Sequence, residues 1–575
     1  MGRNTLKARL SRTGFWFCLP QLIGFLFVFL CPLALCIYYS MTAKSGGFSG
    51  LANYRDLWNS GTFRLALGNT FRFSAVGVLL LVGISFLLSV GFHHLLLYSS
   101  RKIKWMQSGL ITPMVIPSAV IILFCQIFLD AGGVLNQWTG SKTLYLQQSP
   151  YAFWVLIGLY LWKNCGYCTV ILLSALAGID RAQYEAARCD GASVFAQVLH
   201  ITLPQILPSL FFSAIIAIVG VFKIFRESYL LMGEYPHESV YMLQNFINNN
   251  METLNYQRLS AASLIFLCIL MVVIILFIRF SGILEEGGNP NGKKRKLGEA
   301  FLYGFLALFS LLVLAPFLFT VIHSLMPPEQ VQNAYGDLGS KTVSLQLWPK
   351  PLGIRQYIRV FFGTELEWYY SFHNTLLLSV PILLITILLC TMSGYGLSKF
   401  RFPGRKTLLT SYIIILLLPV QVTLVPFFIF FNTMHLMESR FPLIAFCAFS
   451  PFGAFLMYQF IRSIPDDSIE AARLEGASEW RIFWRIVFPQ ATPGIAALTI
   501  LTLIDCFSMI EQPFMLLREK SWYPMSIMLK YLSQQNISEA FVLAVVFVIP
   551  VFLAYLLLQD YLIEGISHTA PGRVK

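Results

Sequence analysis

Long apolar stretches alternate with short polar ones along the whole chain. Each apolar stretch has close to the roughly 20 residues that an α-helix needs to cross a hydrocarbon layer of about 30 Å. The predicted spans cover residues 15–41, 70–96, 106–129, 151–177, 206–225, 258–280, 301–326, 375–398, 408–431, 441–462, 491–510 and 540–559. This pattern predicts an all-α polytopic membrane protein with about twelve transmembrane helices.

A polar stretch in the middle divides the chain into two halves of six spans each. Residues 281–300 are rich in Gly, Asn, Pro and charge, which is typical of a flexible linker. We therefore expect a first half at 1–280, a linker at 281–300 and a second half at 301–575. Short loops on one side of the spans carry Arg and Lys, as the positive-inside rule requires of cytoplasmic loops. Twelve spans then place both termini and the linker in the cytoplasm.

The composition supports this class and argues against others. Hydrophobic residues make up 57% of the chain and charged residues 12%, whereas soluble domains have about 45–50% and about 25%. The formal net charge of +13 comes from basic patches beside apolar stretches, so membrane topology explains it and we expect no nucleic-acid partner. Nearly all of the eleven cysteines lie inside apolar stretches, which indicates small core residues and not a disulfide framework.

One polar segment occurs twice. Glu185 to Ala192 reads Glu-Ala-Ala-Arg-Cys-Asp-Gly-Ala, and Glu470 to Ala477 reads Glu-Ala-Ala-Arg-Leu-Glu-Gly-Ala, 285 positions later. Each copy follows the fourth span of its half, within loops at 180–204 and 465–489. The Gly of each copy predicts a helix stop in the left-handed conformation, and Ser193 and Ser478 can cap a second helix. We expect a helix, a Gly bend and a second helix in each loop.

A purely structural interpretation of these loops is an interfacial helix with an internal ion pair, Glu185–Arg188 or Glu470–Arg473. A pair at that spacing stabilises a helix by only about 0.2–0.5 kcal/mol. The same pattern in two copies at one offset favours a functional role.

The segment resembles the signature of ABC importer permeases: Glu-Ala-Ala, a Gly after three further residues, and Ile-x-Leu-Pro beginning ten positions after the Gly. Further motifs look like the carbohydrate-uptake branch of that family, as in maltose-type permeases. These motifs are Trp162-Lys163-Asn164, Leu176-Ala177-Gly178, Gly394-Tyr395-Gly396-Leu397, Phe402-Pro403-Gly404-Arg405, and the Asn69-Thr70 and Asn374-Thr375 pairs. The resemblance covers both halves, so it implies two six-helix permease halves fused in one chain.

The resemblance also implies partners and roles. Each repeated loop would be a coupling helix that docks on an ABC ATPase subunit, with two such subunits per complex. The residues carried over are Glu185, Ala186, Ala187, Asp190, Gly191, Pro204, Glu470, Ala471, Ala472, Glu475, Gly476 and Pro489. An extracytoplasmic sugar-binding protein would deliver a sugar or oligosaccharide across the bacterial cytoplasmic membrane. ATP and Mg²⁺ would bind to the partner ATPases, with no cofactor in this chain.

Polar and charged residues within or at the edge of spans are candidates for the substrate cavity. A charge at a helix centre costs about 2.5–3.5 kcal/mol on insertion scales, so such groups face a cavity or a partner. The candidates are Lys163, Asn164, Lys223, Arg226, Glu227, Asp505, Glu511 and Gln512. The alternative is an interhelical ion-pair network, such as Glu511 with Lys223 or Arg226.

Two other function classes compete with the importer. One is a twelve-span secondary transporter with its own ion-coupled site. The other is a membrane-embedded enzyme, but no His-rich metal set and no nucleophile with a base stands out at a membrane face. Residues 287–294 nearly spell a phosphate-binding loop, yet a Lys replaces the required Ser or Thr, so we expect no ATP hydrolysis by this chain.

Overall fold

The computed structural model describes most of the chain. The described residues are 3–43, 47–96, 109–110, 112–114, 116–176, 178–179, 181–251, 256–281, 308, 314–335, 353–362, 367–416 and 420–569. Residues 282–300 of the expected linker lie outside them, so the division between the halves stays a prediction.

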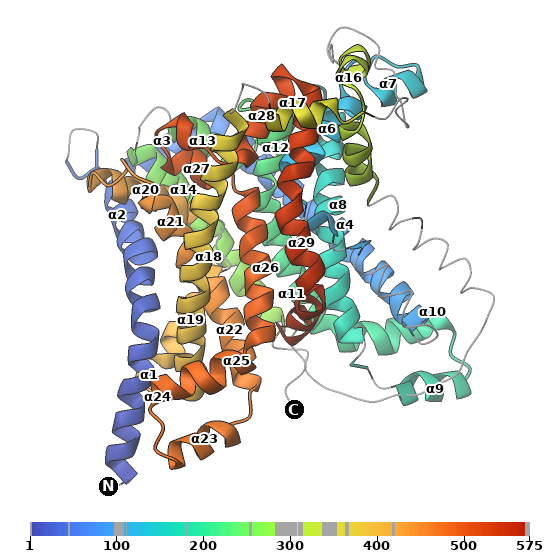
Figure 1. Ribbon diagram of the computed structural model, residues 1–575. Coiled ribbons are helices and arrows are strands. Elements are labelled where there is room, and N and C mark those ends of the chain that lie inside the picture. The colour runs from blue at the N-terminus through green and yellow to red at the C-terminus, as the bar shows by residue number, and fades with distance from the viewer. Residues whose placement is uncertain are drawn as a thin grey trace.

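The described part of the first half is helical (Figure 1). Its helices are α1 (Arg3–Phe25), the π-helical η1 (Leu26–Leu30), α2 (Cys31–Ser40), α3 (Ala52–Asn59), α4 (Gly61–Leu96), α6 (Ser118–Leu129), α7 (Val134–Thr139), α8 (Tyr151–Leu176), α9 (Arg181–Cys189), α10 (Val194–Gln197), η2 (Val198–Thr202), α11 (Leu203–Lys223), α12 (Phe225–Met232), η3 (Glu238–Val240), α13 (Leu243–Met251) and α14 (Tyr256–Ser281).

The second half repeats this plan. Its helices are α16 (Pro328–Tyr335), α17 (Arg355–Phe362), α18 (Glu367–Lys399), α19 (Arg405–Leu416), α20 (Val420–Thr433), α21 (Phe441–Ala448), α22 (Pro451–Ser463), α23 (Asp467–Leu474), α24 (Glu479–Ile482), η4 (Phe483–Val487), α25 (Phe488–Gln490), α26 (Thr492–Ser508), α27 (Glu511–Leu516), η5 (Lys520–Trp522), α28 (Met525–Gln535) and α29 (Ile537–Thr569). Across the described ranges the only β-pairing is an isolated bridge between Thr42 and Phe48.

The predicted fold class, an all-α membrane protein with about twelve spans, is confirmed. Among the described residues, 8 helices are long and apolar enough to cross a membrane, and one bent pair adds a ninth. The three remaining predicted spans correspond to shorter apolar helices at Tyr256–Ile269, Leu314–Ser324 and Thr423–Thr433. The bent pair joins Glu479–Gln490 to Thr492–Ser508 at 73°, so the eleventh span turns sharply where the second repeated loop enters it.

The third span departs from a simple helix. Pro117 is extended, with φ −57° and ψ 136°, and α6 begins only at Ser118. A proline cannot donate a backbone hydrogen bond and its ring clashes with the preceding turn, which is why the helix is interrupted. The break leaves the Ser118 side chain at a helix start in the interior of the bundle, where it contributes to a buried polar cluster.

The two halves interlock. In each half the second, fourth and fifth spans pack together, as α4, α8 and α11 and as α18, α22 and α26. The first span crosses over, because α1 packs on α18 and α2 packs on α20. In return, Phe319 near the start of the second half packs edge-on against Phe124 and Phe128 of α6. The halves therefore form one bundle.

Helices in a membrane associate through close packing, because lipid tails are as apolar as the side chains. Small residues allow this packing where α18 meets α22. A Cβ on Gly394 would lie 2.7 Å from the carbonyl carbon of Met457, a separation that real Cβ atoms essentially never show. Gly394 is therefore required by the neighbouring backbone, and not by its own conformation.

We predict that Gly394→Ala destabilises the protein by about 1–3 kcal/mol, the usual cost of overpacking. The measurement is thermal unfolding of the purified protein in detergent. The matched control is Gly83→Ala on α4, where a new Cβ would meet no atom within 4 Å. Equal melting temperatures for the two variants would contradict the close approach of α18 and α22.

Candidate functional site

The two repeated loops have the same backbone. In the first loop α9 ends before Gly191, which has φ +77°, and in the second α23 ends before Gly476, which has φ +82°. The amide of Ala192 bonds to the carbonyl of Ala187 at 2.8 Å, and Ala477 bonds to Ala472 at 3.0 Å. These bonds close the helix ends in the way that a left-handed glycine permits. The predicted Gly bend is confirmed in both copies.

A second short helix follows each bend. Ser193 Oγ accepts a hydrogen bond from the Ala196 amide at 3.2 Å, and Ser478 Oγ accepts one from the Arg481 amide at 3.3 Å. Both serines therefore cap a helix start, as predicted. The loops lie on the same face of the bundle (Figure 1), which we call the loop face, and α13 and α28 lie at the opposite face.

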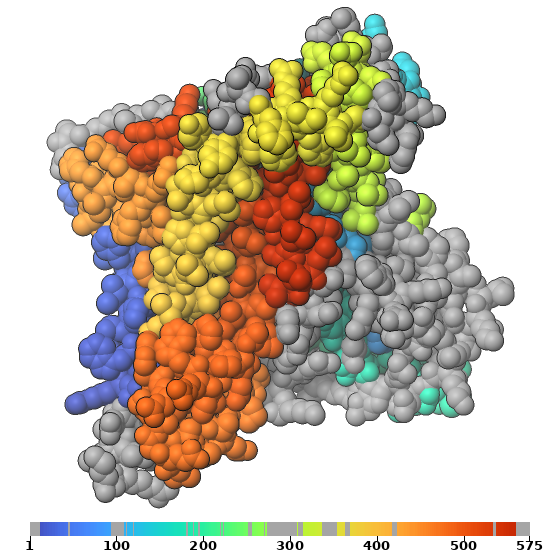
Figure 2. All heavy atoms as spheres, in the orientation of Figure 1, coloured from blue at the N-terminus to red at the C-terminus, as the bar shows by residue number. Residues whose placement is uncertain are grey.

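Most of the residues that the family resemblance assigns to ATPase docking point away from the bundle. Those exposed to solvent are Ala186, Asp190, Gly191, Pro204, Glu470, Ala471, Glu475, Gly476 and Pro489. Glu185, Ala187 and Ala472 are partly exposed. Leu474 lies at the tip of α23 with 89% of its surface exposed. In Figure 2 the orange second loop forms the lower surface, below the yellow α18.

The second loop is anchored by an ion pair that sequence reasoning missed. Arg473 contacts Glu479 at 2.6 Å (Nε to Oε1) and 3.2 Å (Nη2 to Oε2), and the Tyr395 hydroxyl donates to Glu479 Oε2 at 2.7 Å. Arg473 thus pairs with Glu479 and not with Glu470, the partner in the purely structural interpretation, because the bend at Gly476 brings Glu479 back to Arg473. Burial disfavours the charged Arg473, but Glu479 outweighs it and raises the pKa of Arg473.

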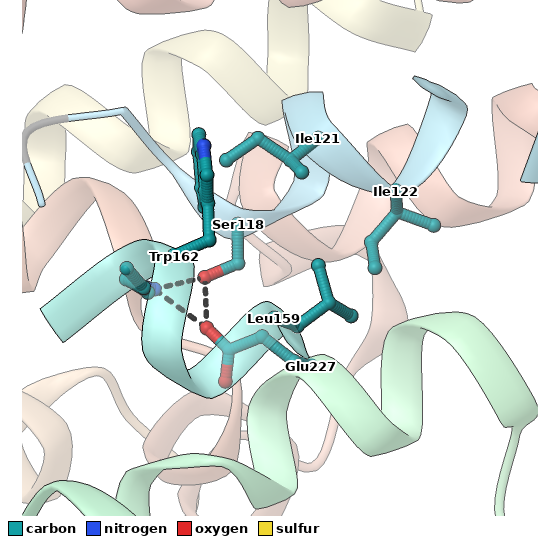
Figure 3. A pocket seen from close by; sticks show the side chains of 7 residues that line it. Ser118, Ile121, Ile122, Leu159, Trp162 and Glu227 are labelled. Atoms are coloured by element: carbon teal, nitrogen blue, oxygen red, sulfur yellow. Dashed lines mark hydrogen bonds and ion pairs between the residues drawn. The ribbon is translucent and has the colours of Figure 1, made fainter. Parts of the chain in front are cut away.

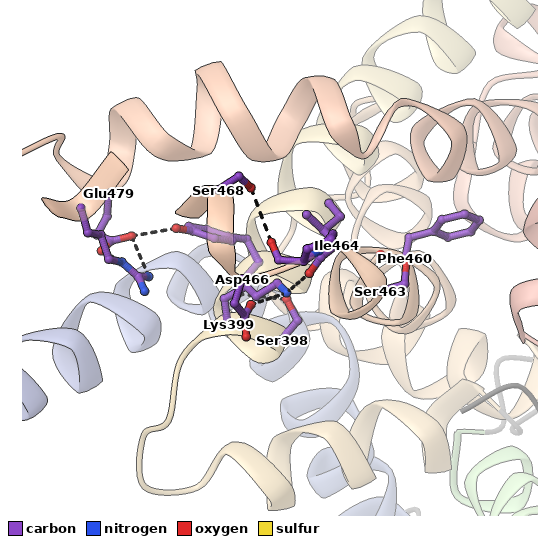
Figure 4. A network of polar contacts seen from close by, with 11 residues as sticks. Ser398, Lys399, Phe460, Ser463, Ile464, Asp466, Ser468 and Glu479 are labelled. Carbon is purple, nitrogen blue, oxygen red and sulfur yellow. Dashed lines mark hydrogen bonds and ion pairs between the residues drawn. The ribbon is translucent and has the colours of Figure 1, made fainter. Parts of the chain in front are cut away.

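Lys399 holds the beginning of the same loop (Figure 4). Its ammonium group donates to the carbonyl of Ile464 and contacts Asp466 Oδ1 at 2.7 Å. Only 6% of the Lys399 side chain is exposed, against 67% for Asp466. The last turn of α18 is thus tied to the loop on both sides of α23, through Lys399 before it and Tyr395 after it.

The first loop is held differently. The Tyr184 hydroxyl is 2.8 Å from Thr202 Oγ1, so it ties α9 to the π-helical turn η2. Burial raises the pKa of Tyr184, with the bond to Thr202 opposing it. At the positions 285 residues later, the second copy has Ile469 and Val487, both buried. The difference between the two loop attachments is visible in the sequence at Glu479, which corresponds to Val194 in the first copy.

A separate polar cluster lies inside the bundle (Figure 3). Lys163 Nζ on α8 is 2.6 Å from Glu227 Oε1 on α12. Ser118 Oγ on α6 donates to the same carboxylate oxygen at 2.5 Å and accepts a hydrogen bond from Lys163. Three helices therefore meet at one carboxylate, and the hydrogen bonds compensate the burial of both charges.

The cluster borders a hollow of about 220 Å³, counted out to open solvent. It is lined by Ser118, Ile121, Ile122, Leu159, Trp162, Lys163 and Glu227. The enclosed free space is only about 10 Å³, room for about one water molecule, so this hollow is too small for an oligosaccharide in the conformation described. Of the predicted cavity residues whose side chains the structure describes, only Lys163 and Glu227 line it.

The other predicted cavity residues lie elsewhere. Asn164 donates to the carbonyl of Tyr160 on its own helix at 2.9 Å, Arg226 and Glu511 are buried, and Asp505 is exposed. Gln512 follows Glu511 on α27. The side chain of Lys223 lies outside the described part, so the Glu511–Lys223 alternative is untested. The observed ion pair joins Glu227 to Lys163, a partnership the sequence did not suggest.

Comparison with known proteins gives a consistent result. The profile of the family described as "Binding-protein-dependent transport system inner membrane component" matches twice, at residues 83–287 and 351–568. The arabinooligosaccharides transport system permease protein AraQ of Bacillus subtilis is 28% identical, over 46% of this chain and 92% of its own. The diacetylchitobiose uptake system permease protein NgcG of Streptomyces coelicolor is 30% identical, over 47% of this chain and 87% of its own.

One solved structure is also similar. It is a bacterial ABC transporter involved in the import of the acidic polysaccharide alginate, with 22% identity and a TM-score of 0.44. The match covers 50% of this chain and 100% of the chain in that structure.

We predict that Glu227→Gln destabilises the protein by about 3–5 kcal/mol, because removing one member of a buried pair leaves the other charge uncompensated. Thermal unfolding in detergent measures the loss. Glu438→Gln, at an exposed position, is the matched control and should leave the melting temperature unchanged. If Glu227→Gln melts like the wild type, water reaches the cluster and the pair is not a structural element.

Proposed function

Because this chain belongs to the family of inner membrane components of binding-protein-dependent transport systems, we propose that it is the membrane subunit of an ATP-driven importer of sugars or oligosaccharides. The observation that carries the proposal is the double match to the family, with one exposed repeated loop in each matched region. One chain thus supplies both permease domains. This assignment favours an importer over the alternative of a twelve-span secondary transporter.

The two loops are the proposed docking sites for ATPase subunits. Each presents a short helix with exposed small and acidic residues on the loop face, and each is stopped by a left-handed Gly. Exposed alanines let another backbone approach closely, and the exposed Leu474 offers an apolar contact to a partner cleft. ATP and Mg²⁺ bind to those partners, and their closure moves the loops. The chain itself is a transport subunit and not an enzyme.

The loop face is proposed to be cytoplasmic. Arg401, Arg405 and Lys406 lie next to the loop-face end of α18, as the positive-inside rule requires. The opposite face then meets an extracytoplasmic binding protein, and both termini lie in the cytoplasm of a bacterial cell. The linker at 281–300 joins the halves on the cytoplasmic side.

A carbohydrate is the proposed cargo. Two relatives, each of which matches about half of this chain, are named for arabinooligosaccharides and diacetylchitobiose. Trp162 lines the hollow beside Lys163 and Glu227, and an indole next to fixed polar groups suits a sugar, which has apolar faces and many hydroxyls. The hollow must enlarge during the transport cycle for this cargo to enter. The remaining predicted cavity residues join it in the enlarged state.

The complex is expected to contain one copy of this chain and two ATPase subunits. Native mass spectrometry of the purified complex measures that ratio, and uptake of arabinotriose, diacetylchitobiose and galactobiose into proteoliposomes measures transport. We expect uptake of at least one of these probes only with ATP present on the ATPase side. Two copies of this chain per complex, or uptake driven by an ion gradient without ATPase subunits, would refute the proposed function.

The bends at Gly191 and Gly476 are expected to be essential for coupling. Both glycines have positive φ, which a β-branched residue adopts only with strain of about 1–3 kcal/mol. The double variant Gly191→Val, Gly476→Val should stay in the membrane and lose ATP-driven uptake. Gly404→Val is the matched control, because Gly404 has φ +84° but lies between α18 and α19. Equal loss of uptake in both variants would show that strain alone, and not the coupling bend, is responsible.

A further inference from the structure

α18 extends between the two faces of the bundle (Figure 1). It is continuous over 33 residues, with Pro381 in its interior, and at about 1.5 Å per residue this corresponds to about 50 Å. It packs against α1, α22 and α26. A helix of this length, packed along its sides, transmits displacement from one end to the other if both ends are attached to moving parts.

The loop-face end of α18 is attached to the second loop. Tyr395 donates to Glu479 after the bend, and Lys399 contacts Asp466 before α23. The Tyr395 ring also packs edge-on against Phe17 of α1 at 5.1 Å. Because these contacts lie on both sides of α23, a displacement of the docking helix reaches the last turn of α18.

The opposite end of α18 is attached to the segment that leads into α28. Asn374 Nδ2 donates to the carbonyls of Ser521 at 2.7 Å and Tyr523 at 3.4 Å. Thr375 Oγ1 accepts a hydrogen bond from the amide of Met525, the first residue of α28, at 2.9 Å. Asn374 is 4% exposed and Thr375 is fully buried. We call these contacts the Asn-Thr clamp.

The clamped segment closes onto the first half. Lys530 of α28 donates to the carbonyl of Tyr229 at 3.1 Å, and its ammonium group lies 3.7 Å from the centre of the Tyr229 ring. Phe514 of α27 packs against the same ring at 5.5 Å. A cation above an aromatic face is attractive. These contacts join the halves at the face opposite the loops.

The first half has the same clamp, and the loop-face end of its helix differs at the position of Tyr395. Asn69 Nδ2 donates to the carbonyls of Glu238 at 2.6 Å and Tyr241 at 3.0 Å. Thr70 Oγ1 accepts from the amide of Leu243, at the start of α13, at 2.9 Å. At the loop face, however, the position on α4 that matches Tyr395 is Val90. Val90 makes apolar contacts in a cluster with Leu176, Ile179 and Ile206.

We propose that α18 is the link that carries movement of the second docking loop to the contact between the halves at the opposite face. Tyr395 and Lys399 are the positioning residues at one end, and Asn374 and Thr375 are those at the other. The proposal rests on the proposed function, in which an ATPase subunit moves the loop at 465–489. It assigns this link to the second half.

The test follows the separation of the halves by pulsed electron resonance between spin labels. The labels are placed by Tyr235→Cys in the first half and Tyr531→Cys on α28, both at exposed positions, with exposed Cys31, Cys189 and Cys268 replaced by Ser. The complex with its ATPase subunits is measured before and after trapping with Mg²⁺-ATP and vanadate. We expect the wild-type labels to move apart on trapping.

Tyr395→Phe removes only the hydroxyl bond to Glu479, and Asn374→Ala removes the clamp. Each should abolish most of the increase in label separation while the bound ATPase subunits still hydrolyse ATP. Residues in one mechanical path show non-additive effects, so the double variant should resemble the more affected single variant. If Asn374→Ala does not fold, Thr375→Val tests the same end with almost unchanged shape.

The matched control combines Tyr395→Phe with Asn69→Ala, which opens the clamp of the other half. Its two effects should add, because α4 and α18 are separate paths. Additive effects of Tyr395→Phe and Asn374→Ala, a full increase in separation in Tyr395→Phe, or an unchanged wild-type separation during ATP hydrolysis would each overturn the link. A chain that binds no ATPase subunit would instead overturn the proposed function, and co-purification distinguishes the two failures.

Discussion

Hydrocarbon offers backbone amides and side-chain charges no hydrogen-bond partner, and this constraint governs the described structure. Helices satisfy their own amides, so the apolar stretches become helical spans. The constraint is stricter for ionised side chains. Glu227 is buried with a lysine and a serine on its carboxylate, and the partners come from two other helices. The burial of one charge therefore holds three helices of the first half together.

Apolar packing between helices in lipid depends on close contact, and it does little to fix how one helix end is attached to the next segment. Direction comes from polar contacts at the helix ends. Asn374 and Thr375 bind the chain entering α28, and Lys399 and Tyr395 bind the second loop. Both sets lie on one helix, which packs closely on α22 at Gly394. The helix stays continuous across Pro381, so a displacement at one set of contacts is passed along α18 to the other set.

The repeat is more symmetric in backbone than in side chains. Both loops have the same Gly bend and the same Ser cap, and both halves have the same Asn-Thr clamp. The attachments of the loops differ, because Glu479 corresponds to Val194 and Ile469 to Tyr184. A fused chain can retain such differences, since each half always meets the other and never a second copy of itself.

Features that depend on residues adjacent in the sequence were predictable from the sequence alone. These are the twelve spans, the repeat, the bends at Gly191 and Gly476 and the caps that follow them. Each is set by local hydrophobicity or local backbone conformation. The partners of Lys163, Glu227 and Arg473 were not predictable, because pairing depends on which helices become neighbours. Only the tertiary structure brings Ser118 to Glu227 behind the break at Pro117. The tertiary structure likewise brings Tyr395 to Glu479, 84 residues away in the sequence, because contacts in a helix bundle are determined by helix packing and not by distance along the chain.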